Sequence, residues 1–154
     1  MKNLIPLFFV ILTIDSSAQS FNEDKISFMN FVKRMYTASP FEGVKIVEGY
    51  DKEVMISVVS IEVAKYPSES IRNRVAQVKA QEKASTFVNG AEISLDVIIS
   101  TKESTDGNNQ VTRVTESLEL IRQSSTGFSQ GLELLQTFEN NDKSKIVYIF
   151  GREL

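Results

Sequence analysis

The chain opens with a basic residue, Lys2, followed by an apolar run over residues 4–14. Small residues come next and suit cleavage by signal peptidase after Ala18. The run is too short for a membrane span, which needs about 20 residues. We therefore predict a secretory signal peptide over residues 1–18 and one mature domain over 19–154, exported to the periplasm or to the outside of the cell. An uncleaved anchor helix is the alternative.

Residues 23–37 have the apolar periodicity of an amphipathic helix. Phe28, Val32 and Met35 recur at the three- and four-residue spacing that places side chains on one helical face. Pro40 disfavours helical backbone at the residue before it, so we expect the helix to end there. We interpret the aromatic stripe as facing a core, with a membrane-facing or ligand-facing stripe as the alternative.

The apolar pattern of residues 70–88 predicts a second helix. This helix has two apolar faces. Ala76, Ala80 and Ala84 put small residues at every fourth position, which allows close approach to a sheet. The opposite face carries an apolar patch in the first half of the helix. We expect helix 23–37 to cover that patch. The patch consists of Ile71, Val75 and Val78.

Dense β-branched residues predict strands over 43–49 and 53–65. In the second strand one parity is apolar up to Val58, and the other parity is apolar from Val59 onward. Either a bulge shifts the phase near Val58, or the strand is buried on both faces there. The first strand is a candidate exposed edge that could pair with a partner.

The C-terminal half is predicted to be β structure. Alternating apolar positions predict a strand over 91–102, an Asp-Gly turn over 105–109 and a hairpin partner over 110–123. A last hairpin joins 132–139 to 145–150. The sequence thus predicts an α+β domain in the order α-β-β-α-β-β-β-β, with an antiparallel sheet and two helices packed on one face.

The absence of Cys and His narrows the chemistry. It excludes disulfides, thiol nucleophiles, a Ser-His-Asp triad and zinc sites built on these ligands. Catalysis would have to use carboxylates, Lys, Tyr, Ser or Thr, and the missing His argues against it. The net charge of −3 gives no electrostatic footprint for nucleic acid. We assign no catalytic, cofactor-binding or metal-binding residues and expect no cofactor.

One motif that resembles a calcium loop and two pairs of carboxylates have simple structural interpretations. Asp106, Asn108 and Gln110 resemble the start of a calcium loop, but the ligand at loop position 12 would be Ser117, so a hairpin turn is the better interpretation. Carboxylates that could pair as in glycosidases are interpreted as solvated side chains on the wet face of a sheet. These pairs are Glu116 with Glu119, and Glu62 with Asp96.

The small-residue loop 124–131 is the best candidate for a contact surface. Phe128 lies between Gly127 and Gly131, and we expect its ring to be exposed. The three residues form the predicted interaction loop, with a plain connection as the alternative.

Several features of residues 75–153 occur together in one family. They include the alanine-striped helix, a strand after Gly90, a long hairpin ending near 117–120, Gly131 and an apolar closing strand. The block resembles the LPP-type envelope lipoproteins and the N-terminal domain of flagellar assembly protein T. The resemblance implies an α+β envelope module that acts by assembly or interaction, without catalytic residues. Lipoprotein members carry Cys at the cleavage site, where this chain has none, so membrane anchoring does not transfer.

These observations predict a non-enzymatic envelope or secreted protein. Its partner would be another envelope protein or a second copy of itself, with no nucleic acid and no membrane span after signal cleavage. The alternatives are a small-ligand carrier and a carboxylate-based hydrolase. A convergent acidic cluster would favour the hydrolase, and an apolar cavity of a few hundred Å³ would favour the carrier. An exposed apolar patch on a closed core would favour assembly.

Overall fold

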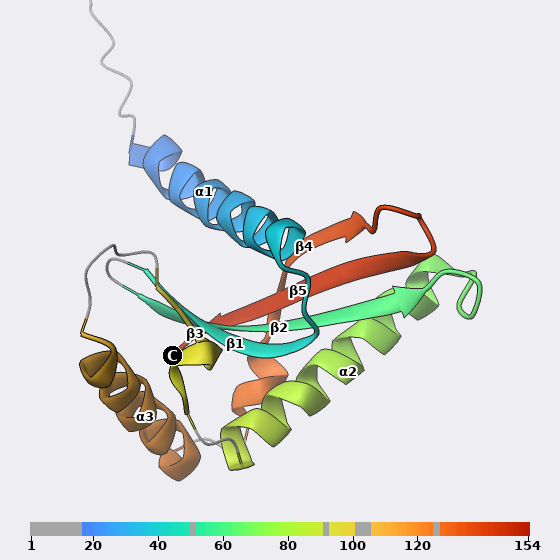
Figure 1. The fold of residues 1–154 in the computed structure, drawn as a ribbon. Coiled ribbons are helices and arrows are strands. Elements are labelled where there is room, and N and C mark those ends of the chain that lie inside the picture. Colours follow the sequence, from blue (N-terminus) through green and yellow to red (C-terminus); the bar gives the residue numbers. More distant parts are fainter. Residues whose placement is uncertain (1–16, 50–51, 91–92, 101–105, 125–126) are drawn as a thin grey trace, which may run out of the picture.

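The fold is α+β, with a five-stranded sheet in the order β3-β1-β2-β5-β4 and helices on both of its faces (Figure 1). It is seen in a computed structural model, which describes residues 17–49, 52–90, 93–100, 106–124 and 127–154. The elements are α1 (Ser17–Ala38), β1 (Gly43–Glu48), β2 (Glu53–Glu62), α2 (Glu69–Gly90), the 3-10 turn η1 (Leu95–Val97), β3 (Ile98–Ser100), α3 (Gly107–Ser124), the 3-10 turn η2 (Phe128–Gly131), β4 (Glu133–Glu139) and β5 (Lys145–Glu153).

The central strand β2 is buried on both faces. Met55 and Val59 belong to the core on the α2 side, whereas Ile56 and Val58 belong to the core on the α1 side. The pairing of β2 with β1 and with β5 runs in continuous register, without a bulge in β2. Of the two interpretations of the apolar pattern near Val58, burial on both faces is therefore the correct one.

The two helices expected from the sequence lie on opposite faces of the sheet, so the prediction of two helices on one face is wrong. Val32 of α1 packs in a cluster with Val58 and Ile149. Ala80 of α2 lies on the other face, where the Ser57 hydroxyl donates a hydrogen bond of 3.0 Å to its carbonyl. Both parities of the central strands are apolar, and each face therefore needs its own helical cover.

The separation of the helices leaves the second apolar patch of α2 without the expected cover. Ile71 is 51% exposed and Val78 is 63% exposed.

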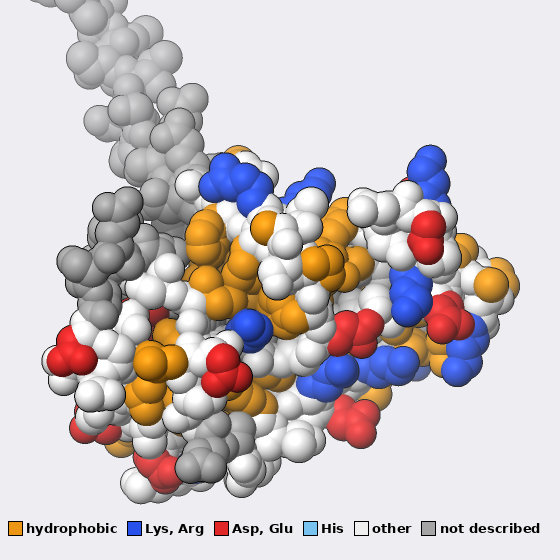
Figure 2. All heavy atoms as spheres, viewed as in Figure 1, with side chains coloured by type: hydrophobic (Ala, Val, Ile, Leu, Met, Phe, Trp, Pro, Cys, Tyr) orange, Lys and Arg blue, Asp and Glu red, His pale blue; other side chains and the backbone are white. Residues whose placement is uncertain are grey.

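On the face drawn in Figure 2, hydrophobic side chains gather between α1 and the sheet. Partly buried aromatic residues of α1, including Phe28 and Phe31, pack against the α1-side core.

A third helix, α3, replaces the predicted strand over 110–123. Val114, Leu118 and Ile121 recur at helical spacing and are buried, whereas Leu120, which the strand interpretation placed with Leu118, is 66% exposed. The carboxylate of Asp106 accepts a hydrogen bond of 3.1 Å from the backbone N–H of Asn108. That contact caps the helix start, so the predicted hairpin turn is wrong as well.

The predicted strand over 91–102 is much shorter in the structure. Leu95–Val97 forms η1, and only Ile98–Ser100 pairs as β3, parallel to β1. Residues 91–92 and 101–102 lie outside the described residues. A parallel partner requires a long crossover connection, here through α2, instead of a tight hairpin. The sheet is consequently mixed, and the element order is α-β-β-α-β-α-β-β.

The last hairpin, β4 with β5, is confirmed, with a register shift between Leu134 and Gln136. Most of the predicted signal peptide, residues 1–16, lies outside the described residues. Within the described part of the chain, no helix is both long enough and apolar enough to cross a membrane.

Candidate functional site

The strand β1 has an open half edge. It pairs with β2 along its whole length, but on its other side β3 covers only Ile46, Val47 and Glu48. In the described part of the chain, the segment Gly43–Lys45 therefore has no strand beside it on that side. A Cβ built on Gly43, whose φ is 120°, would meet no atom within 4 Å. About 10 Å of strand edge thus has no paired strand. The η1 turn contacts β1, and the Asp96 carbonyl in that turn accepts a hydrogen bond from the Lys45 amine.

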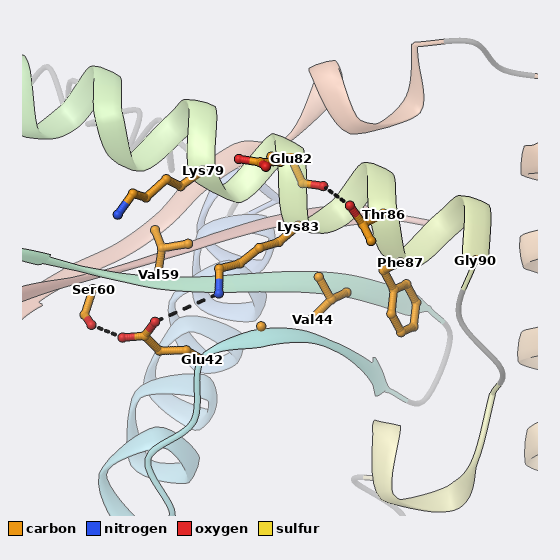
Figure 3. Close-up of a pocket in the computed structure, with 11 residues that line it drawn as sticks. Glu42, Val44, Val59, Ser60, Lys79, Glu82, Lys83, Thr86, Phe87 and Gly90 are labelled. Carbon is orange, nitrogen blue, oxygen red and sulfur yellow. Dashed lines mark hydrogen bonds and ion pairs between the residues drawn. The ribbon is translucent and has the colours of Figure 1, made fainter.

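A groove of about 670 Å³ lies between this open edge and the flank of α2 (Figure 3). Its apolar lining includes Val44 from β1, Val59 from β2 and Phe87 from α2. Its polar rim includes Glu42, which precedes β1, and four residues of α2: Lys79, Glu82, Lys83 and Thr86. An apolar floor with a few polar groups is the usual composition of a binding site.

The rim of the groove carries one ion pair and one lysine that remains available. The Lys83 amine lies 3.9 Å from the Glu42 carboxylate, whose other oxygen accepts a hydrogen bond from the Ser60 hydroxyl. Among the described residues, Lys79 has no carboxylate within ion-pair distance. Exposed pairs contribute about 0–1 kcal/mol, so Glu42 and Lys83 can rearrange at little cost.

Burial of Tyr36, and secondarily the charge of Glu42, raise the pKa of the Tyr36 phenol.

A second depression, of about 430 Å³, lies near the end of β1 that β3 covers. Its most buried acid, Glu48, is 2% exposed and accepts a hydrogen bond of 2.5 Å from the Gln110 side-chain amide. The Arg113 guanidinium forms an ion pair with the same carboxylate. These contacts come from α3, so Glu48 fixes that helix to the end of β1.

Two of the other three carboxylates of this depression are also engaged. Glu53 accepts a hydrogen bond of 3.2 Å from Ser117, and Glu153 lies 3.2 Å from the Lys52 amine. Within the described ranges, no group of acidic residues is arranged to hold a metal ion. The depression has the acidic lining that would favour a hydrolase, but three of its four glutamates already have donors or cations. We therefore interpret it as a structural contact.

The predicted interaction loop is packed differently from the expectation. Phe128 is 7% exposed, so the expected exposure of its ring is wrong. Its ring lies under the Arg152 guanidinium, and a Cβ built on Gly131 would stand 2.2 Å from Nη1 of the same arginine. Gly127 directly precedes η2. The role of the loop as a contact surface stays a prediction, without an exposed aromatic ring to support it.

The predicted acidic groupings do not form catalytic pairs. Glu119 forms an ion pair with Arg122, while Glu116 lines the second depression. Glu62 ends β2, and Asp96 lies in η1, where it accepts a hydrogen bond from Ser94.

The groove itself was not predicted from the sequence, although one signal for it was present. Lys79 and Lys83 are four residues apart, so they share a flank of α2 that belongs to neither apolar face. The flank borders an unpaired strand edge because of where β3 pairs with β1. The sequence pattern did not predict that pairing.

No family model, no curated protein and no solved structure matches this chain. The resemblance to the envelope family stays a prediction. One feature that carried it, the long hairpin ending near 117–120, is helix α3 in the structure.

Proposed function

We propose that this protein is an exported, non-enzymatic interaction module that accepts an extended segment of another protein along the open half of β1. The observation that carries the proposal is the late start of β3, which first pairs at Ile98 opposite Ile46 and leaves Gly43–Lys45 unpaired on that side, beside a groove with an apolar floor. Strand addition of this kind uses backbone hydrogen bonds for affinity and side-chain pockets for specificity. Export is supported by the signal-peptide pattern over residues 1–18.

The opposite edge of the sheet is less suited to a partner. Strand β4 has a register shift between Leu134 and Gln136, and its two ends carry the exposed Glu133 and Glu139. Bulges and charges are the usual devices that prevent pairing at an edge. In β1 the one charged side chain of the open half, Lys45, donates its amine to the Asp96 carbonyl at 3.1 Å. The unpaired half of β1 therefore has neither a bulge nor an uncommitted charge, and the η1 turn is the element that lies against it.

The test uses decapeptides selected from a random phage-displayed library on the purified protein. Selected peptides should slow hydrogen exchange of those amides within Gly43–Lys45 that point away from β2, since these groups gain a strand neighbour. Thr86→Trp fills the groove from an exposed helical position and should weaken binding at least tenfold. Thr112→Trp is the matched control, because Thr86 and Thr112 are both exposed and each donates to the carbonyl four residues earlier at 3.0 Å.

Three outcomes would contradict the proposal. The first is peptide binding that leaves the Gly43–Lys45 amides unchanged, and the second is equal binding by the two tryptophan variants. The third is reproducible turnover of ester, peptide or glycoside substrates that a single Asp or Glu substitution abolishes.

A further inference from the structure

We propose that the groove selects segments carrying a carboxylate side chain, which pairs with Lys79, four positions from an apolar side chain that packs near Val44 and Phe87. This inference rests on the strand-addition function proposed above and names the chemistry of the partner.

The flank of α2 that borders the groove carries two lysines and one glutamate, Lys79, Lys83 and Glu82. At 100° per residue, Lys79 and Lys83 are about 40° apart around the helix, and Glu82 is turned about 60° from Lys79 on the side away from Lys83. Figure 3 shows Lys83 reaching across to Glu42, whereas Lys79 extends over the end of the groove formed by Val59 and Ser60. Lys79 therefore offers a bound segment a cation that no described carboxylate already pairs.

The spacing of the two contacts follows from helix and strand geometry. Lys79 and Phe87 are eight residues apart on α2, which is about 12 Å along the helix axis. A strand lying alongside covers that distance in about four residues. Positions four apart on a strand point to the same face, so one extended segment can present both side chains to the groove. The apolar side chain packs near Val44 and Phe87, and the acidic one reaches Lys79.

The experiment compares decapeptide selection on the wild-type protein and on Lys79→Glu. Wild-type selection should enrich Asp or Glu four positions from an apolar residue, and Lys79→Glu should enrich Lys or Arg at that same position. For one selected peptide, replacing its acidic residue by Lys should weaken binding to the wild-type protein about fivefold at low salt, and less in 0.5 M salt. Lys25→Glu is the matched control, since Lys25 is exposed on α1 across the sheet from α2.

The two proposals can fail separately. Peptides that protect the Gly43–Lys45 amides and lose affinity with Thr86→Trp, but show no acidic preference, would overturn the inference about Lys79 alone. An acidic preference that Lys79→Glu leaves unchanged, or that Lys25→Glu reverses equally, would do the same. Failure of every selected peptide to bind at the groove would overturn both proposals.

Discussion

The Arg152 guanidinium lies over the Phe128 ring, with 4.5 Å between its central carbon and the ring centroid. The same guanidinium donates a hydrogen bond of 2.6 Å to the Phe128 carbonyl. A residue of the last strand thus holds the η2 turn against the core on the α2 side. Phe128 lies between Gly127 and Gly131, and that position suggested an exposed ring. In the structure the ring is packed against the core instead.

Phe128→Ala should destabilise the protein by about 3–5 kcal/mol, because it removes a buried aromatic side chain and leaves a cavity under Arg152. Chemical denaturation followed by circular dichroism measures this loss. An unchanged denaturation midpoint would contradict the burial seen here and would restore the loop as an exposed contact surface.

Gly131→Ala should destabilise by about 1–2 kcal/mol, because the new methyl group displaces Arg152 and weakens its ring contact and hydrogen bond. The Arg152 side chain is the group in the way, so the cost should nearly vanish in an Arg152→Ala background. A double-mutant cycle measures the coupling. Simple additivity would show that Gly131 is required for some other reason.

The opposite placement of α1 and α2 predicts which core mutations interact. Val32→Ala should cost about 1–3 kcal/mol and should couple with Val58→Ala, since both side chains lie in one buried cluster. The same Val32→Ala should be additive with Val75→Ala, to within about 0.5 kcal/mol, because Val75 packs on the other face. Strong coupling between Val32 and Val75 would indicate that the helices share a face after all.

Arg113→Ala should cost about 1–3 kcal/mol, since it removes the cation from the buried Glu48 carboxylate. Adding Glu48→Gln should recover much of that loss, because an amide is less costly to bury than a charge. Arg74→Ala serves as the control, as Arg74 is exposed and forms no ion pair among the described residues. If Glu48→Gln worsens the defect, the carboxylate has a role beyond holding α3.

Asp142 makes the stability of the β4–β5 turn dependent on pH. The Ser144 hydroxyl and then its backbone N–H, which donate to the carboxylate at 2.6 and 2.9 Å, lower the Asp142 pKa. A lowered folded-state pKa gives stability that is present above the unfolded value, about 3.9, and is lost as the pH falls through the folded value. Wild-type protein should therefore be more stable than Asp142→Asn at pH 7, with a difference that shrinks in acid. Thermal melts across this range test it, and a constant difference would count against it.

Local patterns were sufficient to predict the existence of α1, α2, β1, β2, β4 and β5, although α1 begins six residues before the predicted 23–37 and β2 ends three residues before the predicted 53–65. Their periodicities are long and are bounded by residues such as Pro40. The segment 107–124 was misassigned because alternate apolar positions at Leu118 and Leu120 imitate a strand. The helix depends on the longer spacing from Val114 to Ile121 and on the Asp106 cap.

The sequence by itself determined that the chain is α+β, that β2 is apolar on both parities near Val58, and that chemistry based on His or Cys is absent. Only the tertiary structure decided which face each helix covers, because an apolar stripe shows that a side chain is buried without showing what buries it. The groove, too, depends on the tertiary structure. It borders a half of β1 that is unpaired because β3 begins only opposite Ile46 whereas β1 begins at Gly43, and that difference is set by pairing between segments far apart in the chain.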